Sequence, residues 1–172
     1  MVRGGSILPR GRCAVSGSRR GSVRLNTREI AATARLLVQY RLSLEGIQAI
    51  IEEPGSTAHM EAWKVGGPSR TLDVYGNRGS KPAGGKGRPA LAWMLDGKRR
   101  SDLIAVADLS THRVWLFRTS EAFKLAQQHP PGGGHHLIMV TDPGLAHSKH
   151  ERILDSDFTA YLIERRAQEL FQ

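Results

Sequence analysis

Residues 102–108, with the sequence DLIAVAD, constrain the fold more than any other stretch, because their apolar side chains fall on both faces of an extended chain. Two apolar sets alternate along it: Leu103, Ala105 and Ala107 on one face, and Ile104 and Val106 on the other. Successive side chains of a strand point to opposite faces, so both faces of this strand need a cover. The sequence therefore predicts a central strand, buried within a sheet that is packed on both sides.

Shorter patterns predict the elements around this strand. Alternating apolar residues predict further strands over residues 70–76, 90–95, 113–118 and 136–141. Asn26 and Glu29 have the spacing of a capping box, so a helix should begin directly after Asn26. Two more helices are expected, one capped by Thr119 or Ser120 and one over residues 156–171. Residues 43–53 fit either a second helix or a short strand, and the pattern does not separate the two.

Length and composition favour one folded unit with a basic arm. The chain has 172 residues, of which 40% are apolar, and this suits a single core of ordinary size. Residues 1–25 mix Gly, Ser, Arg and Pro without apolar periodicity, which predicts a disordered arm. We therefore expect one α/β (α+β) domain over residues 26–172, with a mixed central sheet flanked by helices.

Several classes of protein can be set aside. The single cysteine, Cys13, excludes an intrachain disulfide and a cysteine-based zinc site. No apolar run approaches the roughly 20 residues that a membrane-spanning helix needs, so no membrane partner is expected. We expect a cytoplasmic protein, although the arginine-rich start also fits an organellar transit segment.

Positive charge is concentrated in two segments. The chain has 25 Lys and Arg against 16 Asp and Glu, and residues 1–28 hold seven of the arginines and no acid. Residues 76–100 hold seven more basic residues against Asp96 alone. Such segments suit a polyanion, because each neutralised phosphate releases counterions. The candidate nucleic-acid contacts in the second segment are Arg78, Lys81, Lys86, Arg88, Arg99 and Arg100.

Carboxylates and a lysine stand at spacings that suit metal-assisted chemistry on phosphate. If the strand over residues 90–95 continued to Lys98, then Asp96 and Lys98 would share one face, and Asp73 could supply a second carboxylate. Mg²⁺ prefers hard oxygen ligands, commonly one or two carboxylates. A neighbouring lysine can stabilise charge on a phosphoryl group. Asp73, Asp96 and Lys98 are therefore the first-choice catalytic residues.

These residues and the element order resemble the PD-(D/E)XK nucleases, whose restriction-endonuclease-like core runs α-β-β-β-α-β. The resemblance covers residues 27–142. It implies that Asp73 and Asp96, with Glu29 of the first helix, hold Mg²⁺ in a metal-dependent nuclease. Hydrolysis of phosphodiester bonds in DNA, in preference to RNA, is the implied activity, and a homodimer is left open.

Two other interpretations of the same stretch stay open. Asp96-Gly97 between apolar strands is also a strong hairpin-turn signal. In a second register of the nuclease core, the strands over residues 102–108 and 113–118 carry the site, and Leu116 and Arg118 take the carboxylate and lysine positions. Asp102 is then the alternative metal ligand.

The main alternative function is a non-catalytic nucleic-acid-binding protein, either an inactive nuclease relative or a regulator or accessory factor. In that case the segment from Asn26 to Glu53 could form a pair of helices similar to a helix-turn-helix. A third option is an interaction protein in which residues 1–25 only direct targeting.

Overall fold

The computed structural model describes residues 25–53, 59–82, 87–142 and 154–172, together with Met1. The helices are α1 (Thr27–Leu44), α2 (Thr119–Leu125) and α3 (Ile163–Leu170), with a 3₁₀ helix, η2 (Asp155–Tyr161). The strands are β1 (Ile47–Ile51), β2 (Met60–Lys64), β3 (Arg70–Asn77), β4 (Lys81–Pro82), β5 (Pro89–Asp96), β6 (Leu103–Asp108), β7 (Arg113–Arg118) and β8 (Gly134–Val140).

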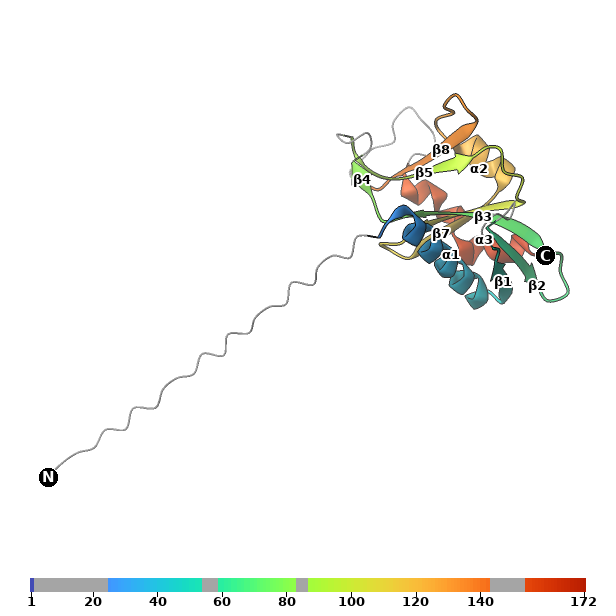
Figure 1. Cartoon of the computed structure of the whole chain (residues 1–172), viewed down its shortest axis with the longest axis horizontal. Helices are drawn as coiled ribbons and strands as arrows, with labels where there is room; N and C mark the ends of the chain where they lie inside the picture. Colours follow the sequence, from blue (N-terminus) through green and yellow to red (C-terminus); the bar gives the residue numbers. More distant parts are fainter. Residues whose placement is uncertain (2–24, 54–58, 83–86, 143–153) are drawn as a thin grey trace.

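These strands form two sheets, a five-stranded sheet in the order β1-β2-β3-β6-β7 and a three-stranded sheet in the order β4-β5-β8 (Figure 1). The larger sheet is mixed, because β3 and β6 run parallel and its other neighbours run antiparallel. A mixed sheet flanked by helices confirms the predicted fold class. The chain begins with α-β-β-β, and four further strands precede α2 and β8.

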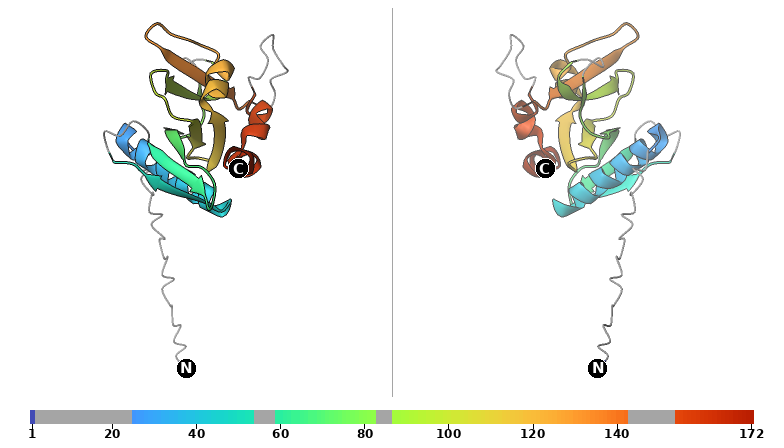
Figure 2. Two further views of the ribbon diagram at one scale, coloured as in Figure 1. Left: turned by 90° about the vertical axis from the view of Figure 1, so that its right-hand side faces the viewer. Right: turned by 90° about the vertical axis from the view of Figure 1, so that its left-hand side faces the viewer.

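The central strand is where the sequence predicts it. All six residues of β6 are buried, and β6 lies between β3 and β7. Leu103, Ala105 and Ala107 pack with α1 and α3. Ile104 and Val106 pack against the inner side chains of β5 and β8. The large sheet is therefore covered by helices on one face and by the three-stranded sheet, α2 and η2 on the other (Figure 2).

Helix α1 begins at the predicted capping box. Asn26 Oδ1 accepts the Glu29 N–H at 3.0 Å, and Glu29 Oε2 accepts the Asn26 N–H at 2.6 Å. Farther along, α1 crosses β3 at Gly76, where a Cβ atom would lie 2.7 Å from the Ala34 Cβ and 3.0 Å from the Ile30 Cγ2. A side chain at Gly76 would push the helix away from the sheet, so this close approach requires glycine.

The predicted elements need correction in three places. Residues 43–53 contain the strand β1 rather than a second helix, so the helix-turn-helix pair is wrong. Strand β2 was not predicted at all, although Met60 and Ala62 are buried in it. The single helix predicted over residues 156–171 is divided into η2 and α3, because the backbone of Leu162 is extended and bridges to Trp115 of β7.

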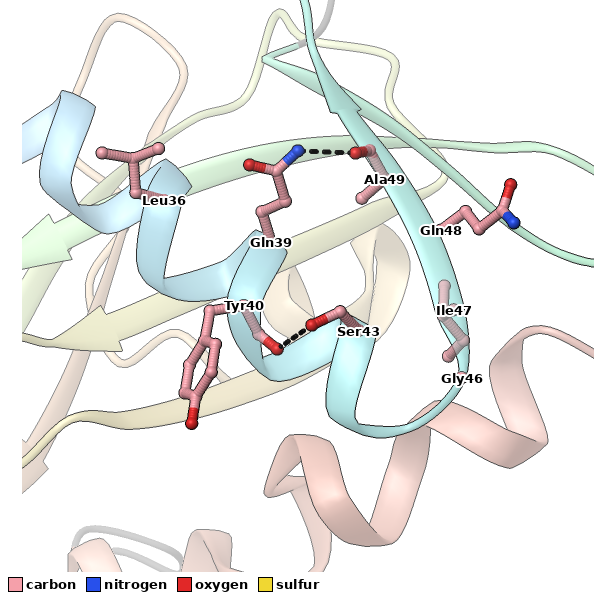
Figure 3. A pocket seen from close by; sticks show the side chains of 8 residues that line it. All are labelled: Leu36, Gln39, Tyr40, Ser43, Gly46, Ile47, Gln48 and Ala49. Atoms are coloured by element: carbon pink, nitrogen blue, oxygen red, sulfur yellow. Dashed lines mark hydrogen bonds between the residues drawn. The ribbon is translucent and has the colours of Figure 1, made fainter.

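A groove lies between α1 and β1 (Figure 3). Its lining consists of Leu36, Gln39, Tyr40, Ser43, Gly46, Ile47, Gln48 and Ala49. The Gln39 side-chain amide donates to the Ala49 carbonyl at 2.7 Å and holds the two elements together. No carboxylate, imidazole or cationic side chain lines this groove, so it is not the place where the predicted chemistry would occur.

Among the described residues, no helix is both long and apolar enough to span a membrane. The predicted basic arm falls almost entirely within residues 2–24, which lie outside the described part of the chain.

Candidate functional site

The site is built around Asp73, a carboxylate in the middle of β3 that is fully buried. Its Oδ2 accepts a hydrogen bond of 2.6 Å from the Ser101 hydroxyl. Its Oδ1 is also buried and has no hydrogen-bond partner. Asp73 and Tyr75 are on the face of β3 that looks toward the three-stranded sheet, so the carboxylate lies between the two sheets. A buried carboxylate needs a compensating charge or donors nearby.

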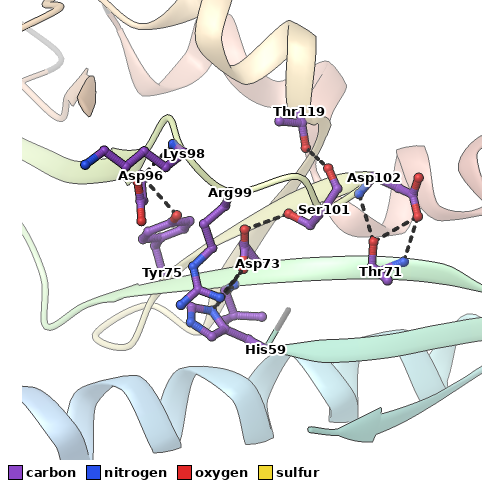
Figure 4. Close-up of polar contacts among 11 residues, drawn as sticks. His59, Thr71, Asp73, Tyr75, Asp96, Lys98, Arg99, Ser101, Asp102 and Thr119 are labelled. Atoms are coloured by element: carbon purple, nitrogen blue, oxygen red, sulfur yellow. Dashed lines mark hydrogen bonds and ion pairs between the residues drawn. The ribbon is translucent and has the colours of Figure 1, made fainter. Parts of the chain in front are cut away.

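Arg99 provides that charge. Its Nη1 lies 3.4 Å from Asp73 Oδ1, and the guanidinium reaches the carboxylate from the loop between β5 and β6 (Figure 4). The loop is anchored at Ser101, whose carbonyl accepts the Thr119 hydroxyl at 2.6 Å. The Arg99 side chain is 30% exposed, whereas that of Asp73 is 1% exposed. The pair therefore connects the buried carboxylate to the solvent surface.

His59 covers the other side of Asp73. Strand β2 pairs with β3 only as far as Leu72, and beyond that point His59 Nδ1 accepts the Val74 N–H at 2.9 Å. Because Nδ1 is an acceptor in this bond, it carries no proton, and its 3.6 Å distance to Asp73 Oδ1 is not an ion pair of a charged imidazole. Burial lowers the pKa of His59 and outweighs the Asp73 carboxylate, which acts in the opposite direction. The imidazole is neutral, with its proton on Nε2.

Tyr75 stands two residues after Asp73 on the same face of β3. Its hydroxyl oxygen accepts the Asp96 N–H at 3.0 Å. Burial raises the pKa of the Tyr75 hydroxyl, so it keeps its proton at neutral pH. In the nuclease pattern that the sequence resembles, the lysine follows the carboxylate of the next strand, so its place here is Lys98 and not Tyr75.

Asp96 and Lys98 do not lie on one strand face. Strand β5 ends at Asp96, whose Oδ1 accepts the Lys98 N–H at 2.9 Å and whose carbonyl accepts the Arg99 N–H at 3.2 Å. Asp96 is exposed, and Lys98 points away from Asp73 (Figure 4). A side chain at Gly97 would overlap the Gly133 carbonyl oxygen, so this turn also requires glycine.

The turn at Asp96-Gly97 is not a hairpin either. Strand β5 pairs with β8, and β6 pairs with β3 and β7, so the chain passes from one sheet to the other after Asp96. The passage carries Arg99 and Ser101 directly onto Asp73. Neither the continued strand nor the hairpin turn describes that arrangement.

Glu29 and Asp102 have structural partners elsewhere. Glu29 caps α1 through the Asn26 N–H. Asp102 Oδ2 accepts both the backbone N–H and the hydroxyl of Thr71 at 2.9 Å, which ties the start of β6 to the start of β3. Of the residues that the second register assigns to the site, Leu116 is buried in the core and Arg118 lies 3.6 Å from Glu169.

These residues do not make a magnesium site. Within the described ranges, no three side chains of His, Cys, Asp or Glu gather closely enough to hold a metal ion. The groups around Asp73 are a hydroxyl donor, a guanidinium and a neutral imidazole, whereas Mg²⁺ needs several oxygen ligands. The donor set around Asp73 therefore does not fit the metal that the resemblance implies.

Of the predicted nucleic-acid contacts, Arg78, Lys81 and Arg100 are exposed and Arg99 is paired with Asp73. Arg88 Nη1 lies 3.0 Å from Asp142 Oδ2. Lys86 lies outside the described residues.

A cavity of about 290 Å³ opens beside the site, between the start of α1, β3 and β5. Its lining consists of Thr27, Ile30, Ala31, His59, Val74, Tyr75, Gly76, Ala92, Trp93 and Met94. His59 and Tyr75 bring polar groups to a largely apolar wall, so a ligand part that enters here reaches the neighbours of Asp73.

A solved structure resembles this arrangement. It is that of a bacterial homing endonuclease, I-Ssp6803I, with a TM-score of 0.55 and 12% sequence identity, over 86% of this chain and 92% of that chain. The chain described here therefore has a nuclease-like fold. At this identity the likeness concerns the fold alone. No family model and no curated protein sequence matches the chain.

Sequence reasoning found Asp73 but missed its neighbours. His59, Tyr75 and Ser101 carry no motif that marks them, because they are brought to Asp73 by strand register and by the crossover loop. One signal was present: Asp73-x-Tyr75 lies on a predicted strand, two residues apart on one face.

Proposed function

We propose that this protein binds DNA through the basic loop of residues 98–100 that lies over Asp73, using its nuclease-like fold as a non-catalytic nucleic-acid-binding scaffold. The observation that carries the proposal is the position of Lys98, Arg99 and Arg100, the densest basic run among the described residues. This run lies in the loop over the buried carboxylate, with Arg99 on Asp73 itself. Cations gathered in a surface loop attract phosphate, and counterions are released when they bind it.

The fold supports DNA as the partner. The similar solved structure is that of a homing endonuclease, a protein that acts on DNA. Among the described residues that the sequence predicts as phosphate contacts, Arg78, Lys81 and Arg100 are exposed at or near β3, β4 and β5. The homodimer stays a prediction, which sedimentation velocity of the full chain would measure.

The neighbours of Asp73 favour binding over cleavage. Arg99 and His59 lie close to Asp73 Oδ1, on the side where a cation would have to approach it. Lys98, which the sequence assigns to the position of the motif lysine, points away from Asp73 (Figure 4). We infer that Asp73 positions Arg99 at the surface and does not hold Mg²⁺.

A second candidate function is metal-dependent hydrolysis of phosphodiester bonds in DNA, with Asp73, Asp96 and Lys98 as the catalytic residues and Mg²⁺ as the cofactor. One observation favours it: Asp73 Oδ1 is buried and makes no hydrogen bond. Buried unsatisfied oxygens are uncommon and often mark a functional position.

Two measurements on the full chain separate the two functions. Anisotropy of a labelled duplex, titrated at several salt concentrations in EDTA and in Mg²⁺, should give the same affinity with and without the metal and a steep loss with salt. Replacement of Arg100 by Ala should lower the slope of log affinity against log salt by about 0.9, the value for one phosphate contact. Replacement of Arg165, an exposed arginine on α3, is the control and should leave the slope unchanged.

Supercoiled plasmid incubated with Mg²⁺ or Mn²⁺ should stay intact. Cleavage by the wild type that is lost in Asp96→Ala would overturn the non-catalytic proposal in favour of the second candidate. Binding that requires Mg²⁺ would count against it as well.

A further inference from the structure

The outer face of the three-stranded sheet holds a hollow of about 410 Å³ that the site around Asp73 does not use. Its lining consists of Asn77, Lys81, Pro82, Ala90, Ala92, Gln128, His136 and Ile138. The inner side chains of the same strands, among them Trp93 and Leu137, are buried in the core. The hollow is therefore a surface feature on the side of β5 and β8 that faces away from the large sheet.

The floor of the hollow is apolar. Ala92 pairs with Ile138 across β5 and β8, and Ala90 and Pro82 continue the surface onto β4. Small side chains on β5 leave the strand surface open, so a planar apolar group can lie against it.

The wall of the hollow carries hydrogen-bonding groups. His136 Nδ1 lies 3.2 Å from Gln128 Oε1, which makes Nδ1 the donor and leaves Nε2 of the imidazole as an acceptor. The Gln128 amide keeps its NH₂ as a donor. The hollow thus has both an acceptor and a donor, the two kinds of group that can pair with the edge of a nucleobase.

The rim of the hollow is positive. Lys81 lines it, and the exposed Arg78 stands three residues before Lys81. Asn77, which also lines it, ties the two sheets together by donating from Nδ2 to the Ala92 carbonyl at 2.9 Å. The hollow therefore offers a partner for each part of a nucleotide: the cation for the phosphate, the apolar floor for the base face, and the donor and acceptor for the base edge.

The hollow also adjoins the cavity beside the site. Ala92 lines both this hollow and the cavity beside His59 and Tyr75. The hollow is therefore next to the neighbours of Asp73.

We propose that this hollow binds one unpaired nucleotide of a nucleic-acid strand that the basic loop of residues 98–100 also contacts. The inference rests on the proposed DNA-binding function and specifies the form of nucleic acid. Its volume is near the lower end of small-ligand pockets, about 300 to 1,000 Å³, which suits one nucleotide. A paired duplex is too wide to enter the hollow, because the major groove of DNA alone is about 12 Å wide.

The test compares fully paired duplex with the same duplex carrying one bulged nucleotide, by fluorescence anisotropy with the full chain. We expect the bulged duplex and a single strand to bind about tenfold more tightly than the paired duplex, which corresponds to stacking of one base. Ala92→Trp fills the hollow and should remove this difference. Ala160→Trp, on the exposed part of the acidic segment η2, is the matched control and should keep it.

Two further variants keep the test informative if Ala92→Trp disturbs folding, which its circular dichroism would reveal. Gln128→Leu removes the base-edge donor and should reduce the preference for the bulged duplex several-fold. Lys81→Ala should lower the salt slope for a single strand by about 0.7. RNA probes of the same sequences identify whether the unpaired nucleotide is from RNA or DNA.

Equal binding of paired and bulged duplexes, or an unchanged preference in both Ala92→Trp and Gln128→Leu, would overturn the inference while leaving DNA binding in place. Absence of binding to every probe would instead overturn the proposed function, and with it the inference.

Discussion

Replacement of Asp73 tests whether this carboxylate is paired with Arg99 or belongs to a cluster of carboxylates that would hold a metal ion. Asp73→Asn keeps an acceptor for the Ser101 hydroxyl but removes the charge that neutralises Arg99. Removing one partner of a buried ion pair costs about 3 to 5 kcal/mol. Because Arg99 is 30% exposed and water can reach it, we expect a smaller loss, about 1 to 2 kcal/mol in the free energy of unfolding.

The assay is urea denaturation followed by the fluorescence of the buried Trp93 and Trp115. Arg99→Met and the double variant complete a cycle, and we expect a coupling free energy of about 1 kcal/mol between Asp73 and Arg99. Asp96→Asn makes the same chemical change at an exposed carboxylate and should alter stability by less than about 0.5 kcal/mol.

The opposite sign would refute this reasoning. Carboxylates gathered for a metal repel one another when the metal is absent, so replacing one of them stabilises the fold. An Asp73→Asn variant with a higher urea midpoint than the wild type, and no coupling to Arg99, would mean that Asp73 belongs to such a cluster.

Three further predictions concern the scaffold. Glu121 is partly buried, which alone would raise its pKa, but hydrogen bonds from Arg166 and from the Arg118 N–H lower it overall. The stability that this lowered pKa contributes is present above pH 4.5 and is lost as the pH falls through the folded-state value. Glu121→Gln should therefore reduce the acid-side slope of stability measured by thermal melts between neutral pH and pH 3, and an unchanged slope would contradict it. Gly76→Ala should cost about 1 to 3 kcal/mol in urea denaturation, because its Cβ would lie 2.7 Å from a side chain of α1, and a wild-type midpoint would count against the close packing. Trp115→Ala should cost about 3 to 5 kcal/mol, since it empties the core between the sheets, and a loss below 1 kcal/mol would show that the core collapses to fill the space.

Much of the fold could be predicted from local patterns. The capping box at Asn26 and the doubly apolar strand over residues 102–108 depend on neighbouring residues, and both predictions are confirmed. Strand β2 was missed because its five residues, MEAWK, show no clean alternation, and its place between β1 and β3 depends on pairing with both.

The candidate site was harder to predict, because its members meet through pairing that is not local. Asp73 was found, but the sequence placed Asp96 and Lys98 beside it on a continued strand. The chain instead turns at Asp96 and crosses between sheets, which brings in Arg99. Nothing in the residues around Gly97 distinguishes a hairpin from a crossover, since both need the same turn chemistry.

The order of the strands along the chain also determines when the outer face of the three-stranded sheet can form. Strand pairs β1–β2 and β6–β7 are close in sequence, but β5 pairs with β8, so Asp96 must find Gly134 and Ala90 must find Val140. Closing a loop of that length costs entropy before any contact compensates for it. During synthesis the chain emerges from its amino end, so the hollow over Ala92 has no second wall until β8 has been made. A nascent chain that stops before β8 would therefore lack the hollow, and binding of an unpaired nucleotide there would begin only after β8 has been made.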